Sequence, residues 1–249
     1  MTMRPSRRQK YKKDKDMIVK VCGRRVAENI RELAKLDVDW MGLIFWPESP
    51  RYVHQIASRG GFYPDYSSLA KKVSQLGGMP EEAKKVNKPL RVGVFVDDMP
   101  QNIVTRVYNY NLDFVQLHGE ESAVMIDNLR RTLMPDIRMV KIIKTIVVES
   151  AADFEKCKEY EDQVDYFLFH TKCEKKGGSG EQFDWTILDA YNGKVPFLLS
   201  GGIGPDDVEH IKTITHPLFA GVDINSRFET EPGVKDIEQV KSFVDALKA

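Results

Sequence analysis

Residues 91–117 read RVGVFVDDMPQNIVTRVYNYNLDFVQL, and this stretch decides the fold class. Two short apolar runs, Arg91–Val96 and Asp113–Leu117, flank the segment Gln101–Tyr110, in which apolar residues recur at intervals of three and four. That period is typical of an amphipathic helix, and the apolar runs are typical of strands buried on both faces. The stretch therefore predicts a strand–helix–strand unit in a parallel sheet covered by helices.

The same alternation extends from residue 18 to the C-terminus. The strand-like runs are Ile18–Cys22, Trp40–Phe45, Arg91–Val96, Asp113–Leu117, Met139–Ile143, Asp165–Phe169, Pro196–Leu199 and Phe219–Asp223. Further helical segments are Ala27–Leu36, Glu121–Leu133, Asp206–Thr213 and Ile237–Leu247. Eight parallel strands form either a closed barrel or a long open sheet. Closure leaves no exposed edge and suits a chain of about 250 residues. We predict an α/β protein with a single-domain (β/α)8 TIM barrel.

Two segments are expected to lie outside the regular barrel. Residues 1–16 carry seven Lys or Arg against Asp14 and Asp16, although the whole chain balances 37 basic with 37 acidic residues. A basic segment with so few apolar residues predicts a disordered tail before the barrel at 17–249. An insertion at about 55–89, rich in Gly and Pro, predicts an enlarged, partly mobile loop after the second strand.

Composition and cysteine usage exclude several classes of protein. The 249 residues are 42% hydrophobic and 30% charged, which is typical of a globular protein. No apolar run approaches the roughly 18 residues of a membrane helix, and no apolar segment of a secretory signal follows the basic tail. Cys22, Cys157 and Cys173 have no metal-site spacing. We expect a cytoplasmic protein without a bound metal, and with neither membrane nor nucleic acid as partner.

Catalytic groups of a barrel lie at the carboxyl ends of the strands, and polar residues and glycines cluster at these positions. Gly201 and Gly202 follow the seventh run, and Asn225 and Ser226 follow the eighth. Glycine lets the backbone approach a ligand, and N–H groups there and at a following helix form an anion cradle. A tight turn and a helix cap are the alternatives. Because barrels commonly hold phosphate in these two loops, we expect a phosphate site.

Motifs in this order resemble the phosphoribosylanthranilate isomerase family of tryptophan biosynthesis from about Ile18 to the C-terminus. The matching segments are VKVCG (19–23), SPRYV (49–53), VGVFV (92–96), QLHG (116–119), GGSG (177–180) with FDW (183–185), LSGG (199–202), and GVD (221–223) with PG (232–233) and KD (235–236). The resemblance implies an Amadori rearrangement of a phosphorylated small-molecule substrate without any cofactor. Such a reaction needs an acid at the ring oxygen of the sugar and a base at C2.

The resemblance also implies roles for four residues. Cys22 matches the general base, and we expect a helix N-terminus and neighbouring arginines, Arg24 and Arg25, to lower its pKa from about 8.5 toward neutrality. Arg51 matches an arginine that contacts the anthranilate part of the substrate, to which a planar guanidinium is suited. Gln116 matches a polar residue of the pocket. Asp223 matches a residue at the pocket floor.

One position departs from the family pattern. Where the family has an aspartate as general acid, this chain has His170. An imidazolium with a pKa near about 6.5 is suited to proton transfer, and we expect it to pair with a Cys22 thiolate. The larger ring also reaches a different point, and a misplacement of about 1 Å can lower a rate roughly a hundredfold. We therefore predict reduced turnover relative to a His170→Asp variant.

Three other functions remain open from the sequence. The first is a phosphate-ligand-binding barrel that has lost catalysis through His170, and the second is an isomerase or synthase acting on a related phosphoribosyl or indole-glycerol phosphate substrate. The third is a cysteine nucleophile built on Cys22 and His170, for which no oxyanion hole is evident. No helix shows an extended exposed apolar face, so we expect a monomer. Gly177–Gly180 is expected to suit a lid over the substrate.

Overall fold

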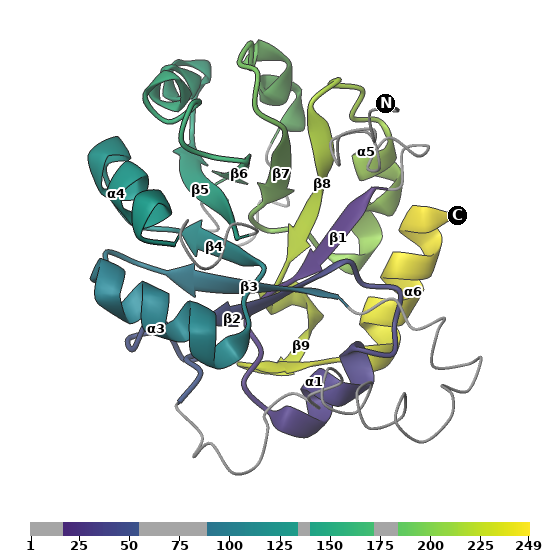
Figure 1. The fold of residues 1–249 in the computed structure, drawn as a ribbon. Helices are drawn as coiled ribbons and strands as arrows, with labels where there is room; N and C mark the ends of the chain where they lie inside the picture. The colour runs from purple at the N-terminus through teal and green to yellow at the C-terminus, as the bar shows by residue number, and fades with distance from the viewer. Residues whose placement is uncertain (1–16, 55–88, 134–139, 172–183) are drawn as a thin grey trace, which may run out of the picture.

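The computed structural model describes residues 17–54, 89–133, 140–171 and 184–249. Within them, β1 to β8 pair in parallel with their neighbours and close into one barrel, seen along its strands in Figure 1. Closure is made by β8 against β1, with Ile18 opposite Gly221 and Val21 opposite Ile224. The predicted barrel is thereby confirmed over the open sheet. The barrel strands are β1 (Ile18–Val21), β2 (Trp40–Ile44), β3 (Leu90–Phe95), β4 (Phe114–Leu117), β5 (Lys141–Val148), β6 (Tyr166–Thr171), β7 (Phe197–Ser200) and β8 (Phe219–Ile224).

Helices surround this barrel on its outside (Figure 1). The α-helices are α1 (Ala27–Leu33), α3 (Pro100–Tyr110), α4 (Ala123–Leu133), α5 (Val208–Lys212) and α6 (Ile237–Lys248). The 3-10 helices are η3 (Ala151–Glu159), η4 (Trp185–Ala190), η5 (Pro205–Asp207) and η6 (Ser226–Phe228). A short antiparallel hairpin, β9 (Glu229–Glu231) and β10 (Val234–Lys235), follows β8 and precedes α6. The expected tail at 1–16, the insertion at 55–88 and the glycines at 177–180 lie outside the described residues.

The region from β5 to β6 differs most from the prediction. We expected a strand at Met139–Ile143, but β5 extends to Val148 because the β-branched run TIVV (145–148) continues it. The connection that follows is η3, which begins after Ser150 with Asp153 accepting a hydrogen bond from the Ser150 backbone N–H at 2.9 Å. A 3-10 helix has three residues per turn and therefore lacks the period of 3.6 by which the other helices were predicted.

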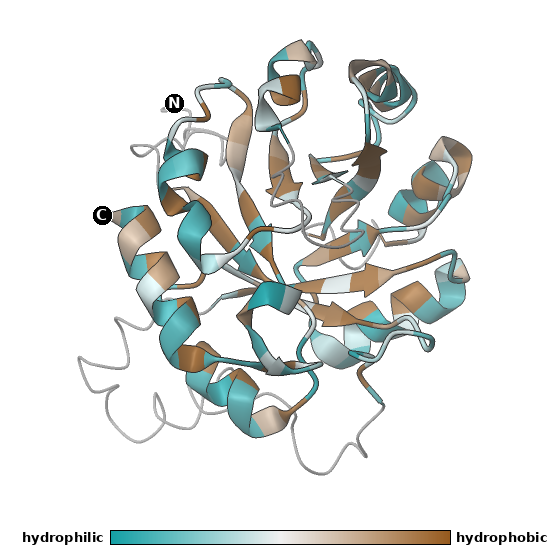
Figure 2. Ribbon diagram, turned by 180° about the vertical axis from the view of Figure 1, so that it is seen from behind, coloured by the Kyte–Doolittle hydropathy of each residue, from teal (hydrophilic) through white to brown (hydrophobic). Residues whose placement is uncertain are grey.

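The barrel carries two apolar cores, one on each side of the sheet. The inner core is formed by Cys22, Trp40, Val92, Val94, Phe114, Ile143, Leu168 and Leu198. The outer core fills the space between strands and helices. Figure 2 shows the result, with strands largely hydrophobic and helices striped by hydropathy. Trp40 and Phe114 pack in a tilted arrangement with ring centroids 4.2 Å apart, and the ring centroid of Tyr166 lies 5.1 Å from that of Trp40. Because these rings begin β2, β4 and β6, they fill the amino end of the barrel and leave the carboxyl end for a site.

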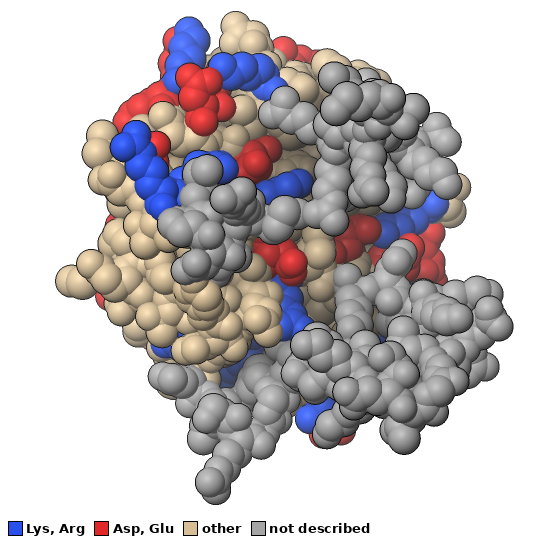
Figure 3. Space-filling view, in the orientation of Figure 1, with Lys and Arg blue, Asp and Glu red and all other residues tan. Residues whose placement is uncertain are grey.

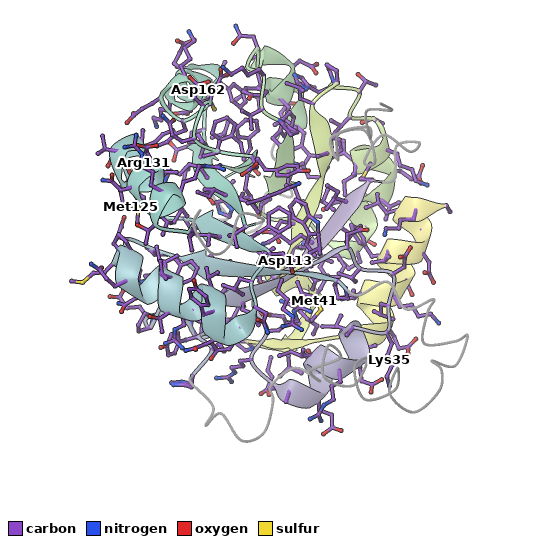
Figure 4. The ribbon with its side chains drawn as sticks, viewed as in Figure 1. Lys35, Met41, Asp113, Met125, Arg131 and Asp162 are labelled. Atoms are coloured by element: carbon purple, nitrogen blue, oxygen red, sulfur yellow. The ribbon has the colours of Figure 1, made fainter. Side chains whose placement is uncertain are left out.

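The exterior carries charges of both signs. On the face in Figure 3, acidic and basic side chains lie next to one another instead of in separate fields. Figure 4 shows Lys35, Arg131 and Asp162 at the periphery, whereas the fully buried Met41 lies among the strands. Over the described ranges no helix combines the length and apolar character needed to cross a membrane. In the same ranges no cluster of His, Cys, Asp and Glu is suited to a metal ion.

Candidate active site

A cavity of about 400 Å³ opens at the carboxyl ends of the barrel strands. This volume lies within the range of small-molecule sites. All nine residues predicted for the site contribute to its lining. They are Cys22, Arg51, Gln116, His170, Gly201, Gly202, Asp223, Asn225 and Ser226. The structure thus brings together residues that are spread over more than two hundred positions of the sequence.

The register of the sheet explains why these side chains meet at one level. His170 of β6 pairs with Ser200 of β7, Ser200 pairs with Asp223 of β8, and Asp223 pairs with Lys20 of β1. Cys22 follows β1 two residues beyond Lys20, and its backbone N–H donates to the Ile224 carbonyl at 2.9 Å. Side chains two positions apart on a strand share a face, so Cys22 and Lys20 both belong to the barrel interior.

Cys22 lies in a tight, buried pocket of this interior. Its side chain is 4% exposed, and a Cβ at Gly42 of the adjacent β2 would collide with its sulfur. Burial raises the pKa of the Cys22 thiol, Lys20 and Lys235 lower it, and Asp223 raises it further. The net direction is upward, so the expected lowering toward neutrality is wrong.

The prediction that Arg24 and Arg25 supply the positive charge beside Cys22 is also wrong. Arg24 turns back into the protein, where its side chain is buried and Nη2 donates to the Val21 carbonyl at 2.8 Å. Arg25 is exposed, and α1 begins only at Ala27. Lys20 is the cation that most favours the thiolate. The alternation of a strand could have indicated Lys20, because it is the only charged residue in the otherwise apolar run Ile18–Cys22 and lies two positions before the thiol.

Arg51 belongs to a second ionic cluster at the cavity rim. Its Nε and Nη2 both donate to the Glu229 carboxylate, with Nη2 2.6 Å from Oε2. Lys235 donates to the other Glu229 oxygen at 2.6 Å and to Asn225 Oδ1 at 2.7 Å. Burial would raise the pKa of Glu229, but hydrogen bonds from Arg51 and Lys235 lower it below its ordinary value. Burial lowers the pKa of Lys235 to about 8. The cluster fixes Arg51 and the loop after β8 in one arrangement.

The loops after β7 and β8 present backbone donors to the cavity. Gly201 has a φ of 104°, and a Cβ there would collide with the Thr171 carbonyl, so a side chain is excluded. Among the described residues, the backbone N–H groups of Gly202, Ile203 and Ser226 donate to no protein acceptor. Unpaired N–H groups that face a cavity are suited to an anion.

Opposite this ionic cluster, His118 lies beside His170. The two rings meet edge to face, with centroids 5.7 Å apart. His118 Nδ1 lies 3.0 Å from both Gln116 Nε2 and Thr145 Oγ1. Burial, followed by His170 and two lysines, lowers the pKa of His118 to about 3. The ring is therefore neutral, and Nδ1 accepts the hydrogen bond from the Gln116 amide, which leaves the proton on Nε2. We did not predict His118, although it follows Gln116 by two residues.

Comparisons with known proteins agree with this geometry. A family model described as N-(5'phosphoribosyl)anthranilate (PRA) isomerase matches residues 53–246. The chain belongs to the N-(5'-phosphoribosyl)anthranilate isomerase family. Among curated members, the isomerase of Parabacteroides distasonis is 42% identical over 231 residues, which cover 93% of either chain. That of Phocaeicola vulgatus is 38% identical over 93% of this chain and 98% of its own.

Solved structures of the isomerase family share the fold. Phosphoribosyl anthranilate isomerase from Thermotoga maritima is 29% identical, with a TM-score of 0.66 over 93% of this chain and 98% of its own. A second structure, 26% identical with a TM-score of 0.65 over the same shares of the two chains, is an isomerase in complex with reduced 1-(o-carboxyphenylamino)-1-deoxyribulose 5-phosphate. The resemblance seen in the sequence motifs is thereby confirmed, and so is the barrel.

Proposed function

We propose that this chain catalyses the Amadori rearrangement of N-(5'-phosphoribosyl)anthranilate to 1-(2-carboxyphenylamino)-1-deoxyribulose 5-phosphate, an isomerisation of the aldose–ketose type. The observation that carries the proposal is the meeting, in one cavity, of a thiol, an imidazole, an arginine and two loops with unpaired N–H groups. The reaction requires one acid, one base and a phosphate grip, and each has a candidate here. The chain's own residues supply all of these groups, so we propose no cofactor.

The substrate would be held at its two ends. The loop N–H groups of Gly202 and Ser226 are suited to the phosphate. Ile44, Trp46 and Val94 line an apolar part of the cavity that is suited to the aromatic ring. Because Glu229 occupies the Nε and Nη2 edge of Arg51, the remaining Nη1 is the donor for the carboxylate of the substrate.

His170 is proposed as the general acid. It protonates the furanose oxygen while the bond from that oxygen to C1 breaks, which gives the open Schiff base. Of the two neighbouring imidazoles, His170 is assigned this role because the pKa of His118 is lowered to about 3, which keeps His118 neutral. Cys22, as thiolate, then takes the proton from C2, and the resulting enol takes up a proton at C1 and loses the proton of its C2 hydroxyl to give the ketone.

The imidazole is larger than the carboxylate that the family pattern has at this position, so the ring oxygen of the substrate meets a displaced acid. We propose that turnover is reduced for this reason while binding persists. The test compares the natural chain with His170→Asp in steady-state assays on freshly prepared phosphoribosylanthranilate. We expect kcat of His170→Asp to be roughly a hundredfold higher, with a similar KM. Equal kcat values would contradict the proposal.

The same turnover assay, together with a binding measurement and a complementation test, addresses the other candidate functions. If the protein were a phosphate-ligand-binding barrel without catalysis, the unsubstituted chain would bind the reduced product analogue but would turn over no substrate. A barrel for another phosphoribosyl substrate would fail to complement a tryptophan auxotroph that lacks the isomerase. We further propose that the chain acts as a monomer in the cytoplasm, and light scattering on the purified protein tests the first of these points.

A further inference from the structure

Lys20 is a buried ammonium group with unused hydrogen-bonding capacity. Its side chain is 0% exposed, and Nζ lies 2.8 Å from Asp223 Oδ1 across the pairing of β1 with β8. Neither atom is aligned for a hydrogen bond, and Nζ makes no other well-aligned bond within the described residues. A buried charge is stable when it has hydrogen bonds as well as an opposite charge. Lys20 therefore has donors left for a further acceptor.

The sulfur of Cys22 is that acceptor. Residues 20 and 22 share one face of the strand, so both side chains project into the barrel. Each of the two groups favours the charged form of the other. Cys22 and Asp223 line the cavity, whereas Lys20 does not, so the ammonium lies beneath the cavity floor. From that position it can act on the thiol without touching a ligand.

We propose that Lys20 is a positioning residue whose buried ammonium, on the same strand face as Cys22, stabilises the thiolate form of that cysteine against its burial. Its catalytic consequence rests on the proposed function, in which that thiolate accepts the C2 proton of the Schiff base. In this step the proton moves from carbon to sulfur. The C2–H electron pair forms the C1–C2 double bond, and the C1–N π pair moves to nitrogen. Lys20 keeps its own protons throughout.

Three other charged groups act on the same sulfur. Asp223 of β8 opposes the thiolate, Lys235 of β10 favours it, and Arg51 of the loop after β2 interacts with it. Lys235 and Arg51 already share the Glu229 carboxylate, with distances of 2.6 Å each. Lys20 is likewise ion-paired, with Asp223 at 2.8 Å, but of the cations near the sulfur it lowers the pKa of Cys22 most. It is therefore the cation whose removal should affect the thiol most.

The test measures the thiolate directly and needs no substrate. The rate at which iodoacetamide alkylates Cys22 is followed against pH in the full chain, with the modified peptide identified by mass spectrometry, because only the thiolate reacts. We expect Lys20→Met to raise the midpoint of this profile by about one pH unit or more. Asp223→Asn should lower the midpoint, because the carboxylate that disfavours the thiolate is lost while Lys20 remains. Lys20→Arg should keep the midpoint near that of the natural chain.

Lys144→Met is the matched control. Lys144 is also buried and ion-paired, 2.9 Å from Glu121, but it does not line the cavity and is not among the groups acting on Cys22. Its removal should leave the midpoint unchanged. An unchanged midpoint in Lys20→Met, or equal upward shifts in Lys20→Met and Lys144→Met, would overturn the proposal. If Lys20→Met does not fold by circular dichroism, an upward or absent shift in Asp223→Asn overturns it. Absence of turnover on phosphoribosylanthranilate would refute the proposed function and leave these profiles valid.

Discussion

The two sides of the cavity differ in how they keep polar groups inside a barrel. On and beneath the side formed by β8, β1, the loop after β2 and the hairpin after β8, paired charges form what is here called the ionic wall: Lys20, Arg51, Asp223, Glu229 and Lys235, each paired with an opposite charge. The side formed by β4 to β6, the imidazole wall, consists of Gln116, His118, Thr145 and His170. In the imidazole wall His118 is kept neutral by burial and by its neighbours.

The difference teaches how an acid and a base can share one cavity. Paired charges stay charged when buried, so the ionic wall provides a fixed field for a thiolate and a phosphate. Burial and the neighbouring His170 keep His118 neutral, so the imidazole wall does not carry a positive charge on both rings. The proposed proton donor, His170, then lies on the side opposite the proposed proton acceptor, Cys22. The two groups therefore do not exchange a proton directly with each other.

The largest effect is expected from removing the base of the ionic wall. Cys22→Ala should lower kcat about a thousandfold, since positioned bases commonly contribute 10²–10⁴ in rate. Affinity for the reduced product analogue should remain, because the phosphate loops are untouched. Steady-state kinetics and calorimetric titration provide the two readouts. Cys157→Ala, at a buried cysteine of η3 away from the cavity, should keep its rate. A rate of Cys22→Ala within tenfold of the natural chain would remove the thiol from the mechanism.

The imidazole wall should make the protein sensitive to acid. The pKa of His118 is about 3 when folded, against about 6.5 for a free imidazole, so the unfolded chain binds the extra proton. The free energy of unfolding is therefore unaffected by His118 above pH 6.5 and falls as the pH decreases toward 3, by roughly 5 kcal/mol in all. When urea unfolding is measured from pH 7 to 4, the free energy of unfolding of His118→Asn should change less steeply with pH than that of the natural chain. The exposed His54→Asn is the control and should retain the natural slope.

The ionic wall should instead respond to alkali. The pKa of Lys235 is lowered by burial to about 8, so its charge and the hydrogen bonds that fix Asn225 weaken as the pH rises through that value. We expect the Kd of the reduced product analogue to increase about tenfold between pH 7 and 9.5, which corresponds to about 1.4 kcal/mol. Lys235→Arg keeps its charge and should flatten this dependence. Lys144→Arg, remote from the loop, should behave like the natural chain.

The smallest effect is expected from the basic segment 1–16. Both walls are composed of residues from Lys20 onward, so a chain starting at Met17 should bind and turn over substrate within about twofold of the full chain. Parallel kinetics on the two proteins measure this. A larger loss would extend the functional unit beyond 17–249.

Sequence periodicity predicted most of the fold, because strands buried on both faces and amphipathic helices have distinct patterns. It failed where a pattern was missing, as in η3, whose 3-10 geometry does not repeat at 3.6 residues. Two unpredicted polar groups of the interior, Lys20 and His118, were within reach of sequence reasoning, since each lies two positions from a predicted site residue on its strand. Glu229 was not, because it belongs to a short hairpin that follows η6 and β8, and Lys235 was part of a matching motif to which no role in the site was assigned.

The sequence by itself identified nine of the residues that line the cavity. Parallel strands of a barrel end on one rim, so strand-end residues such as Cys22, Gln116, His170 and Asp223 converge whatever the details of packing. Only the tertiary structure decided which charges act on which of them. Arg24, two positions after Cys22 in the chain, turns away to the Val21 carbonyl, and Lys20, two positions before it, is the cation that acts most on the thiol. Electrostatic interactions depend on distance and burial in space, and Arg24 lies beyond the end of β1, where the alternation of a strand no longer directs its side chain.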